Sequence, residues 1–362
     1  MAARVAIIGT GLIGGSVGLA LSRAGCEVAG FDADAARTER AKELGAVTVV
    51  AASISEAVSG ADVVFVAVPV GRIATVVGEA LASGATLVTD VGSVKGPVVA
   101  AVEADREDAA RFVGGHPMAG SEQDGVDGAD ADLFVGATWV LTPTARTDER
   151  AYTELRSLIR QLGAEVVTVT PEHHDELVAL VSHVPQLAAS TLMDVATTRE
   201  EEHRTLLRLA AGGFRDMTRV AAGHPAIWPD ILSANRDAVL TALDAYLDAL
   251  QRIRGVVAES DPAELLAFLE RARAARRSLP VGAMGDAKLV ELRVPVPDRP
   301  GVLAEVTTLA GQLGVNVHDL EIAHSGEGGA GVLVLVIAAT RADAYVAALH
   351  ERGYHTSRNE LS

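Results

Sequence analysis

The sequence is nearly free of cysteine, because Cys26 is the only one among 362 residues. A single cysteine cannot form a disulfide within the chain, which excludes a disulfide-stapled framework. The N-terminus carries no signal-peptide pattern, and no apolar stretch is long enough to span a bilayer. We therefore expect a soluble protein in a reducing, cytoplasmic setting, with Cys26 as a small core residue.

Positive charge is scarce as well. Lys and Arg total 31 against 48 Asp and Glu, which gives a net charge of −17. An acidic chain without a basic run is not expected to bind nucleic acid or an anionic membrane. The hydrophobic share of 49% and charged share of 22% are those of an ordinary globular protein, and the length allows two or three domains.

A strand, a glycine-rich turn, a helix and a second strand follow one another within residues 4–32. The apolar run Val5–Ile8 leads into a G-x-G-x-x-G pattern that begins at Gly9, and the next helix aims its N-terminus at bound phosphates. Asp32 is placed to accept both ribose hydroxyls of NAD and to repel the 2′-phosphate of NADP. Arg37 is the only nearby cation, so NAD is favoured. The expected cofactor contacts are Gly9, Gly11, Leu12, Ile13, Gly14, Asp32, Val68 and Pro69.

Strand-like and helical segments then alternate, which predicts a parallel sheet with right-handed crossovers and an NAD-binding Rossmann domain over 1–170. Ligands of such sheets lie beyond the carboxyl ends of the strands. Ser93 follows the fourth strand, and His116 stands where the next strand ends, at the expected place of a nicotinamide ring. Imidazole has a pKa suited to proton transfer near neutrality, so His116 is the candidate acid–base group.

The pattern changes to helical periodicity over 171–282, which predicts an all-α domain. This domain would form the far wall of the active site and, through its apolar helix surface, a homodimer interface. Pro185 is expected to kink the first long helix, and 231–257 is expected to form one helix.

Two arginines and several histidines stand out in the helical region. Arg215 and Arg219 lie four residues apart on one helix face, which suits either anion binding or a solvated surface. Their setting among glycines and aromatic residues favours anion binding. The histidines do not have the spacing of a metal site, so no metal is expected.

A linker rich in small residues, 280–287, precedes a last domain over 288–362. Its segments follow the order β-α-β-β-α-β, which predicts a ferredoxin-like α+β domain. Nothing in this domain suggests catalysis. The loop DRPGVL opens a helix, where backbone N–H groups can hold a carboxylate.

Five motifs together resemble the prephenate dehydrogenase family, which includes arogenate and cyclohexadienyl dehydrogenases. In chain order they are GTGLIGGS, DVGSVK, GGHPMAGSE, HDELVALVSHVP and GGFRDMTR. The tail resembles an ACT domain through PDRPGVLAEV and NVHDLEI. The resemblance implies NAD-dependent oxidative decarboxylation of prephenate or arogenate in tyrosine biosynthesis, with feedback by tyrosine through the tail.

The same resemblance implies roles for individual residues. His116 would accept the proton of the substrate hydroxyl as hydride leaves, Ser93 would orient His116 and that hydroxyl, and Arg219 would bind a substrate carboxylate. Further substrate contacts would be Ser121, Glu122, His174, His183, Gln186 and Arg215. Many family members have a histidine where Gln186 stands, in S-H-x-P-H. The choice between the keto acid of prephenate and the amino acid of arogenate therefore stays open.

Two other functions are possible from the sequence. A β-hydroxyacid dehydrogenase would need a lysine in the first long helix, and the stretch His174–Thr191 contains none. A catalytically silent NAD-binding sensor would rely on the tail, but His116 and Ser93 at strand ends argue against it.

Overall fold

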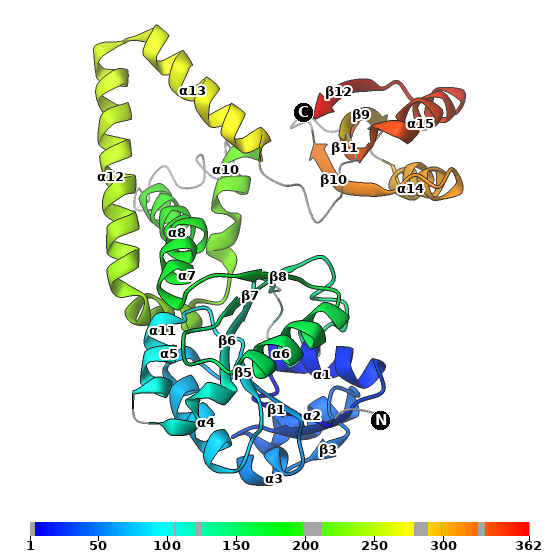
Figure 1. Cartoon of the computed structure of the whole chain (residues 1–362). Coiled ribbons are helices and arrows are strands. Elements are labelled where there is room, and N and C mark those ends of the chain that lie inside the picture. Colours follow the sequence, from blue (N-terminus) through cyan, green and yellow to red (C-terminus); the bar gives the residue numbers. More distant parts are fainter. Residues whose placement is uncertain are drawn as a thin grey trace. The chain divides into compact units, whose positions relative to one another are not determined.

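The computed structural model describes residues 4–104, 106–120, 123, 125–197, 212–278, 289–297, 299–324 and 330–361 (Figure 1). The chain divides into two compact units, Met1–Gln251 and Arg252–Ser362. Residues 206–211 of the predicted helical region and the linker expected at 280–287 lie outside the described residues. None of the described helices has the length and apolar character needed to cross a bilayer.

An eight-stranded sheet forms the centre of the first unit, in the order β3-β2-β1-β4-β5-β6-β7-β8 (Figure 1). Neighbouring strands from β3 to β6 pair in parallel, which confirms the predicted Rossmann-type sheet. The strands are β1 (Arg4–Ile8), β2 (Glu27–Phe31), β3 (Val49–Val50), β4 (Val63–Val66), β5 (Val88–Asp90), β6 (Phe112–Pro117), β7 (Thr138–Thr142) and β8 (Glu165–Thr168).

Strand β7 departs from the predicted parallel arrangement. It runs antiparallel to β6, with His116 opposite Val140, and β8 pairs in parallel with β7. A parallel return needs a long crossover, usually a helix, whereas the described part of 118–137 holds one short 3₁₀ turn, Val126–Gly128. The strand therefore comes back in the opposite direction.

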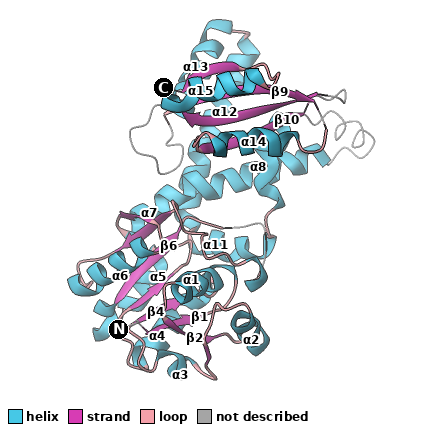
Figure 2. Cartoon of the chain, turned by 90° about the vertical axis from the view of Figure 1, so that its right-hand side faces the viewer, coloured by secondary structure: helices cyan, strands magenta, loops and turns pink. Residues whose placement is uncertain are grey.

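Helices cover both faces of this sheet because side chains alternate along each strand. Val5 and Ile7 point to one face and pack there with α1 (Leu12–Arg23), α2 (Ala35–Glu43) and α6 (Glu149–Gln161). Ala6 and Ile8 point to the other face. There they belong to a core shared with α3 (Ile54–Val58), α4 (Val70–Ala82) and α5 (Gly96–Glu103), as Figure 2 helps to follow. Helix α5 was not among the expected elements.

Helix α7 (Pro171–Val178) continues through a π-helical turn, Ala179–His183, into α8 (Val184–Thr197). Pro185 is the second residue after the π turn. Proline has no N–H and its ring clashes with the carbonyl one turn earlier, so a regular α-helix does not accommodate it. The irregularity expected at Pro185 thus takes the form of a wider turn just before it.

The helix expected over 231–257 is interrupted. Helix α11 (Trp228–Ala234) ends before Asn235, and α12 (Arg236–Glu259) begins after it. The side-chain amide of Asn235 donates a hydrogen bond to the carbonyl of Asp175 at 2.9 Å. Asparagine side chains that bond to backbone groups favour such helix boundaries, which the apolar periodicity alone does not reveal.

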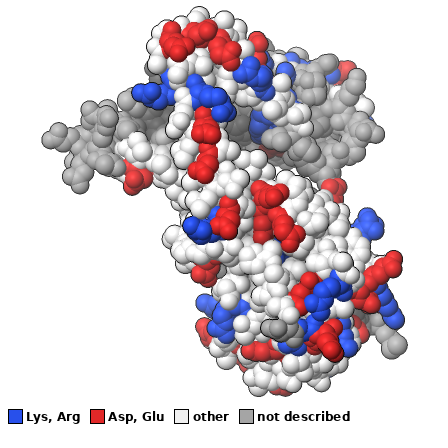
Figure 3. Space-filling view, turned by 60° about the vertical axis from the view of Figure 1, so that its left-hand side comes forward, with Lys and Arg blue, Asp and Glu red and all other residues white. Residues whose placement is uncertain are grey.

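Helical surfaces of the first unit expose apolar side chains. Leu180 and Val181, in the turn after α7, are 58% and 62% exposed. Leu240, Leu247 and Leu250 of α12 are also exposed, at spacings that place them on one helix face. Figure 3 shows that basic and acidic side chains are interspersed on one face of the molecule and that much of this face carries neither. Exposed apolar side chains grouped on one helix face are typical of an interaction site.

The second unit contains α13 (Pro262–Arg277) and a four-stranded antiparallel sheet in the order β10-β11-β9-β12. The strands are β9 (Leu289–Pro297), β10 (Val317–His324), β11 (Ala330–Ala338) and β12 (Ser357–Leu361), and the helices between them are α14 (Val302–Gln312) and α15 (Ala339–Glu351). Leu292, Leu335 and Val306 join strands and helices in one core. The predicted ferredoxin-like order is confirmed.

Candidate active site

The glycine turn after β1 has the shape of a dinucleotide site. Gly9 has φ +96°, and a Cβ there would lie 2.2 Å from the Ala67 carbonyl oxygen. A Cβ on Gly14 would lie 2.0 Å from the Gly9 carbonyl oxygen, whereas a Cβ on Gly11 would meet nothing within 4 Å. Gly9 and Gly14 are therefore needed for close packing. Gly11 leaves open space at the N-terminus of α1, where backbone N–H groups can bind a pyrophosphate.

Asp32 is held beside this turn by backbone donors. Its Oδ2 accepts a hydrogen bond from the Thr10 amide at 2.8 Å, and its Oδ1 accepts one from the Asp34 amide at 3.0 Å. Arg37 pairs with Asp34 at 3.6 Å. The remaining predicted cofactor contacts lie around the same turn. Leu12 and Ile13 open α1, and Val68 and Pro69 lie between β4 and α4.

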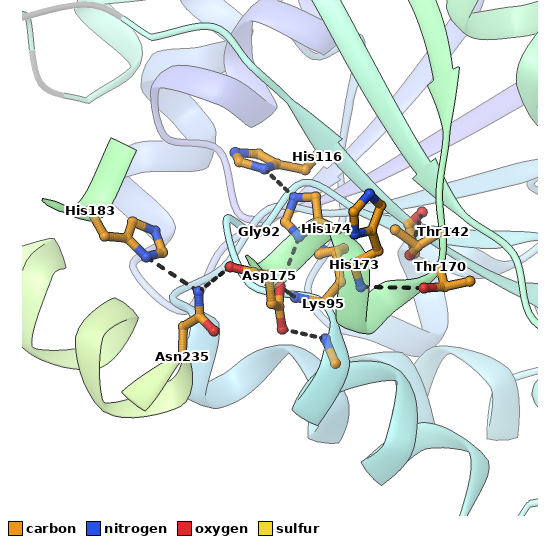
Figure 4. A network of polar contacts seen from close by, with 12 residues as sticks. Gly92, Lys95, His116, Thr142, Thr170, His173, His174, Asp175, His183 and Asn235 are labelled. Carbon is orange, nitrogen blue, oxygen red and sulfur yellow. Dashed lines mark hydrogen bonds and ion pairs between the residues drawn. The ribbon is translucent and has the colours of Figure 1, made fainter. Parts of the chain in front are cut away.

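A chain of three side chains forms the centre of the candidate active site (Figure 4). His116, near the carboxyl end of β6, has its Nδ1 2.8 Å from Nε2 of His174 on α7. The other ring nitrogen of His174, Nδ1, lies 2.8 Å from Oδ1 of Asp175. The two rings meet edge to face, with centroids 5.1 Å apart. Both nitrogens of His174 are therefore engaged within the protein, and its side chain is 1% exposed.

Asp175 also fixes the start of α5. Its Oδ1 accepts a hydrogen bond from the Lys95 amide at 2.8 Å, and its Oδ2 accepts one from the Gly96 amide at 2.7 Å. A carboxylate at this position satisfies two N–H groups that a helix start leaves without partners. Ser93 lies half-buried in the same loop. One carboxylate thus joins the loop after β5 to α7.

A buried ion pair supports the strand that carries His116. The Lys95 ammonium contacts the Asp90 carboxylate and donates to the Gly115 carbonyl at 2.8 Å, and both charged side chains are fully buried. Asp90 Oδ1 accepts a hydrogen bond from the Gly115 amide at 3.1 Å. Burial lowers the pKa of Lys95, and the neighbouring carboxylates Asp90 and Asp175 oppose that shift. The residue before His116 is held through both its amide and its carbonyl.

Burial sets the charge state of two histidines in the cluster. It lowers the pKa of His116 well below the ordinary value of 6.5, and the nearby His174, Lys95 and His183 lower it further. Burial also lowers the pKa of His183 to about 4, with Asp175 opposing the shift. Near neutral pH, His116 is therefore a neutral imidazole that can accept a proton.

His183 and Asn235 belong to the same cluster. The Asn235 amide, which donates to the Asp175 carbonyl, also lies 3.3 Å from Nδ1 of His183. The Trp228 ring meets His183 edge to face at 6.0 Å. Asn235, at the helix break, therefore contacts both the Asp175 carbonyl and the His183 ring.

The two predicted anion-binding arginines line a pocket of about 570 Å³ that opens beside α8. Both are exposed, Arg215 on α10 (Gly212–Thr218) and Arg219 in the 3₁₀ turn after it. Among the described residues, its lining is Ser190, Met193, Arg215, Thr218, Arg219, Ala221 and Ala222. Gln186 is buried on α8 and lies 3.4 Å from Ser190 through its amide nitrogen. Helix α8 thus runs from the histidine cluster to the arginine pocket.

The structure brings His116, His174 and His183 into one cluster and places Arg215 and Arg219 in one pocket. His116 has its hydrogen-bond contact with His174, and the orienting role expected for Ser93 stays a prediction. Ser121 and Glu122 lie outside the described residues.

Sequence reasoning missed four polar residues of the cluster, namely Asp90, Lys95, Asp175 and Asn235. The first three stand inside or beside the quoted motifs DVGSVK and HDELVALVSHVP, which was the available signal. Within the described part of the chain, no three His, Cys, Asp or Glu side chains are grouped as metal ligands.

The lowered pKa of His183 predicts a pH dependence of stability. An unfolded chain binds a proton on this histidine near its ordinary pKa of 6.5, whereas the folded chain does so only near 4. Stability is therefore lost as pH falls through this window. Thermal unfolding should show that His183→Gln loses less Tm than the wild type between about pH 7 and about pH 4.5. His173→Gln is the control, because His173 is exposed. An equal loss of Tm in all three proteins would contradict the assignment.

Three family descriptions match successive parts of the chain. "Prephenate dehydrogenase, nucleotide-binding domain" matches residues 17–168, "Prephenate dehydrogenase, dimerization domain" matches 170–271, and "ACT domain" matches 290–351. A prephenate dehydrogenase of Bacillus subtilis is 35% identical over 335 residues, which cover 91% of this chain and 90% of the relative.

Two solved structures are similar as well. One is a prephenate dehydrogenase of A. aeolicus in complex with hydroxyphenyl propionate and NAD+. It has a TM-score of 0.71 and 30% identity, and the match covers 77% of this chain and 99% of that one. The other is a Synechocystis arogenate dehydrogenase, with a TM-score of 0.64, 31% identity, and coverage of 75% and 98%.

Proposed function

The chain belongs to the prephenate dehydrogenase family, and we propose that it is an NAD-dependent prephenate dehydrogenase. The reaction converts prephenate and NAD+ into 4-hydroxyphenylpyruvate, carbon dioxide and NADH. The observation that carries the proposal is a neutral, half-buried His116 at the carboxyl edge of a nucleotide-binding sheet. Support for NAD comes from Asp32, which faces the glycine turn, and from the A. aeolicus relative solved with NAD+.

In this proposal His116 accepts the proton of the ring hydroxyl through Nε2. Bound NAD+ supplies the acceptor for the hydride. Loss of that proton increases the electron density that the oxygen donates to the ring carbon from which hydride departs. Loss of the ring carboxylate as carbon dioxide then restores aromaticity. Ser93 orients the hydroxyl, as the family resemblance implies.

The arginine pocket binds the anionic part of the substrate. Guanidinium groups stay charged at any working pH and pair with carboxylates through two parallel hydrogen bonds. Arg219 binds a substrate carboxylate, and Arg215 adds positive charge at the same opening. In a chain of net charge −17, this local pair of cations opposes the overall field.

Arogenate, alone or beside prephenate, is the second candidate substrate, because of Gln186. Its amide can donate and accept hydrogen bonds, so it suits either the keto acid or the amino acid side chain. The similar Synechocystis enzyme is an arogenate dehydrogenase.

We further propose a homodimer and an amino-acid effector. The exposed apolar side chains of α12 and of the turn after α7 supply the dimer surface, in agreement with the dimerization description that matches 170–271. The ACT domain binds the effector, which we take to be tyrosine, the end product. The domain boundaries 1–170, 171–282 and 288–362 are part of the same proposal.

The direct test is NADH formation with purified full-length protein. Prephenate and arogenate are compared side by side, each with NAD+ and with NADP+, and tyrosine is added to the fastest combination. We expect the highest kcat/KM for prephenate with NAD+, and inhibition by tyrosine. A higher kcat/KM for arogenate would select the second candidate, and no NADH from either substrate would refute the enzyme.

His116→Asn should lower kcat on the order of 10²- to 10⁴-fold, which is the usual contribution of a positioned acid–base group. The measurement is steady-state NADH formation, with the KM for NAD+ as evidence that the nucleotide still binds. His173→Asn is the matched control, since it changes an exposed histidine to the same residue. A kcat close to that of the wild type in His116→Asn would remove His116 from the chemistry.

Arg219→Ala should mainly raise the KM for the substrate, on the order of 10-fold or more, because a charged hydrogen-bond partner is lost. The KM for NAD+ should stay the same. Arg236→Ala, at an exposed position on α12, serves as the control for loss of one positive charge. An unchanged substrate KM would show that Arg219 is a solvent-exposed surface residue without a role in substrate binding.

A further inference from the structure

The starting point is the set of donors around the Asp175 carboxylate. Two backbone amides, of Lys95 and Gly96, already donate to its oxygens at 2.8 and 2.7 Å. Its third close partner is Nδ1 of His174, at 2.8 Å from Oδ1. A carboxylate is only an acceptor, so Nδ1 of His174 carries a hydrogen and donates it.

The state of His174 then fixes the state of His116. A neutral imidazole with its hydrogen on Nδ1 presents a lone pair at Nε2. That lone pair lies 2.8 Å from Nδ1 of His116, which must therefore be the protonated nitrogen of its ring. The lone pair of His116 is left on Nε2, the atom that faces away from this chain of hydrogen bonds.

We propose that His174 and Asp175 are positioning residues that hold His116 in the one tautomer able to accept the hydroxyl proton. This inference rests on the proposed function and adds two residues to it. The proton of the substrate hydroxyl moves to Nε2 of His116 and returns from there to the same oxygen when loss of carbon dioxide restores the aromatic ring. The imidazolium that forms donates through Nδ1 to His174, which donates to Asp175. No proton has to reach the carboxylate.

The anchor is rigid enough for this role. Asp175 is tied to the start of α5 by its side chain and to Asn235 by its carbonyl, at 2.9 Å. Within the described residues, the titratable groups that act on His116 are His174, Lys95 and His183, and Asp175 faces His174. Because His174 is 1% exposed, water does not compete for its nitrogens.

Two substitutions separate the two hydrogen bonds of His174. Glutamine places its amide near the position of Nε2, so His174→Gln keeps a partner for His116. Asparagine places its amide near Nδ1, so His174→Asn keeps a partner for Asp175 only. We expect His174→Asn to lower kcat on the order of 10- to 100-fold with little change in substrate KM, and His174→Gln to recover much of that loss. Equal losses in both variants, or none, would overturn the proposal.

A double-mutant comparison distinguishes positioning from a structural role. In the His116→Asn background, His174→Asn should cost less than about 2-fold, since the residue through which it acts is gone. The same 10- to 100-fold loss in both backgrounds would make His174 merely structural.

The tautomer can also be read without turnover. Long-range ¹H–¹⁵N NMR of histidine-labelled protein should show His116 with its hydrogen on Nδ1 and an unprotonated Nε2, and His174→Asn should abolish this preference. A hydrogen on Nε2 of wild-type His116 would refute the proposal even if the enzyme converts prephenate. Failure of the wild-type protein to make NADH would refute the proposed function, while the NMR result would still decide the tautomer.

Discussion

The carboxylate of Asp175 receives two backbone amides from the start of α5 and the ring of His174, all within 2.8 Å. It sits on α7, the first helix after the sheet ends, and contacts the loop that follows β5. A single negative charge therefore holds the helical segment against the edge of the sheet where nucleotides bind. Moving this charge by the length of one bond would alter the loop, the helix and the histidine chain together.

Asp90 and Lys95 have a comparable task on the sheet side. Burial of an ion pair costs desolvation energy and is by itself weak evidence of a gain in stability. Here the ammonium and the carboxylate each also bond to the backbone of Gly115. The pair therefore fixes the backbone of Gly115, the residue that precedes His116.

Much of this arrangement could be predicted from the sequence. Parallel sheets impose a local pattern of apolar strands followed by glycines. This pattern correctly predicted most strands of the first unit and the positions of Asp32 and His116 near strand ends. The direction of β7 could not be predicted in this way, because it depends on what the chain does between Pro117 and Thr138. The break at Asn235 was missed because its cause is a bond to Asp175, 60 residues away.

The site was predictable to a similar degree. His116, His174 and His183 belong to the motifs GGHPMAGSE and HDELVALVSHVP, and the fold brings them together. The groups that orient them are ordinary aspartate, lysine and asparagine residues. Their function depends on burial and on which atoms face one another, and neither can be read from a single sequence. The assignment of the remaining family positions, such as Ser93 and Gln186, rests on resemblance.

The π turn at Ala179–His183 sets the phase between the two ends of α7 and α8. Such a turn acts like one inserted residue, and each residue of a helix advances the direction of its side chains by about 100°. The extra residue thus sets the direction of Gln186 and Ser190 on α8 relative to that of Asp175 on α7. Deletion of one residue from this turn would rotate Ser190 and Met193, which line the arginine pocket, by about 100° relative to Asp175.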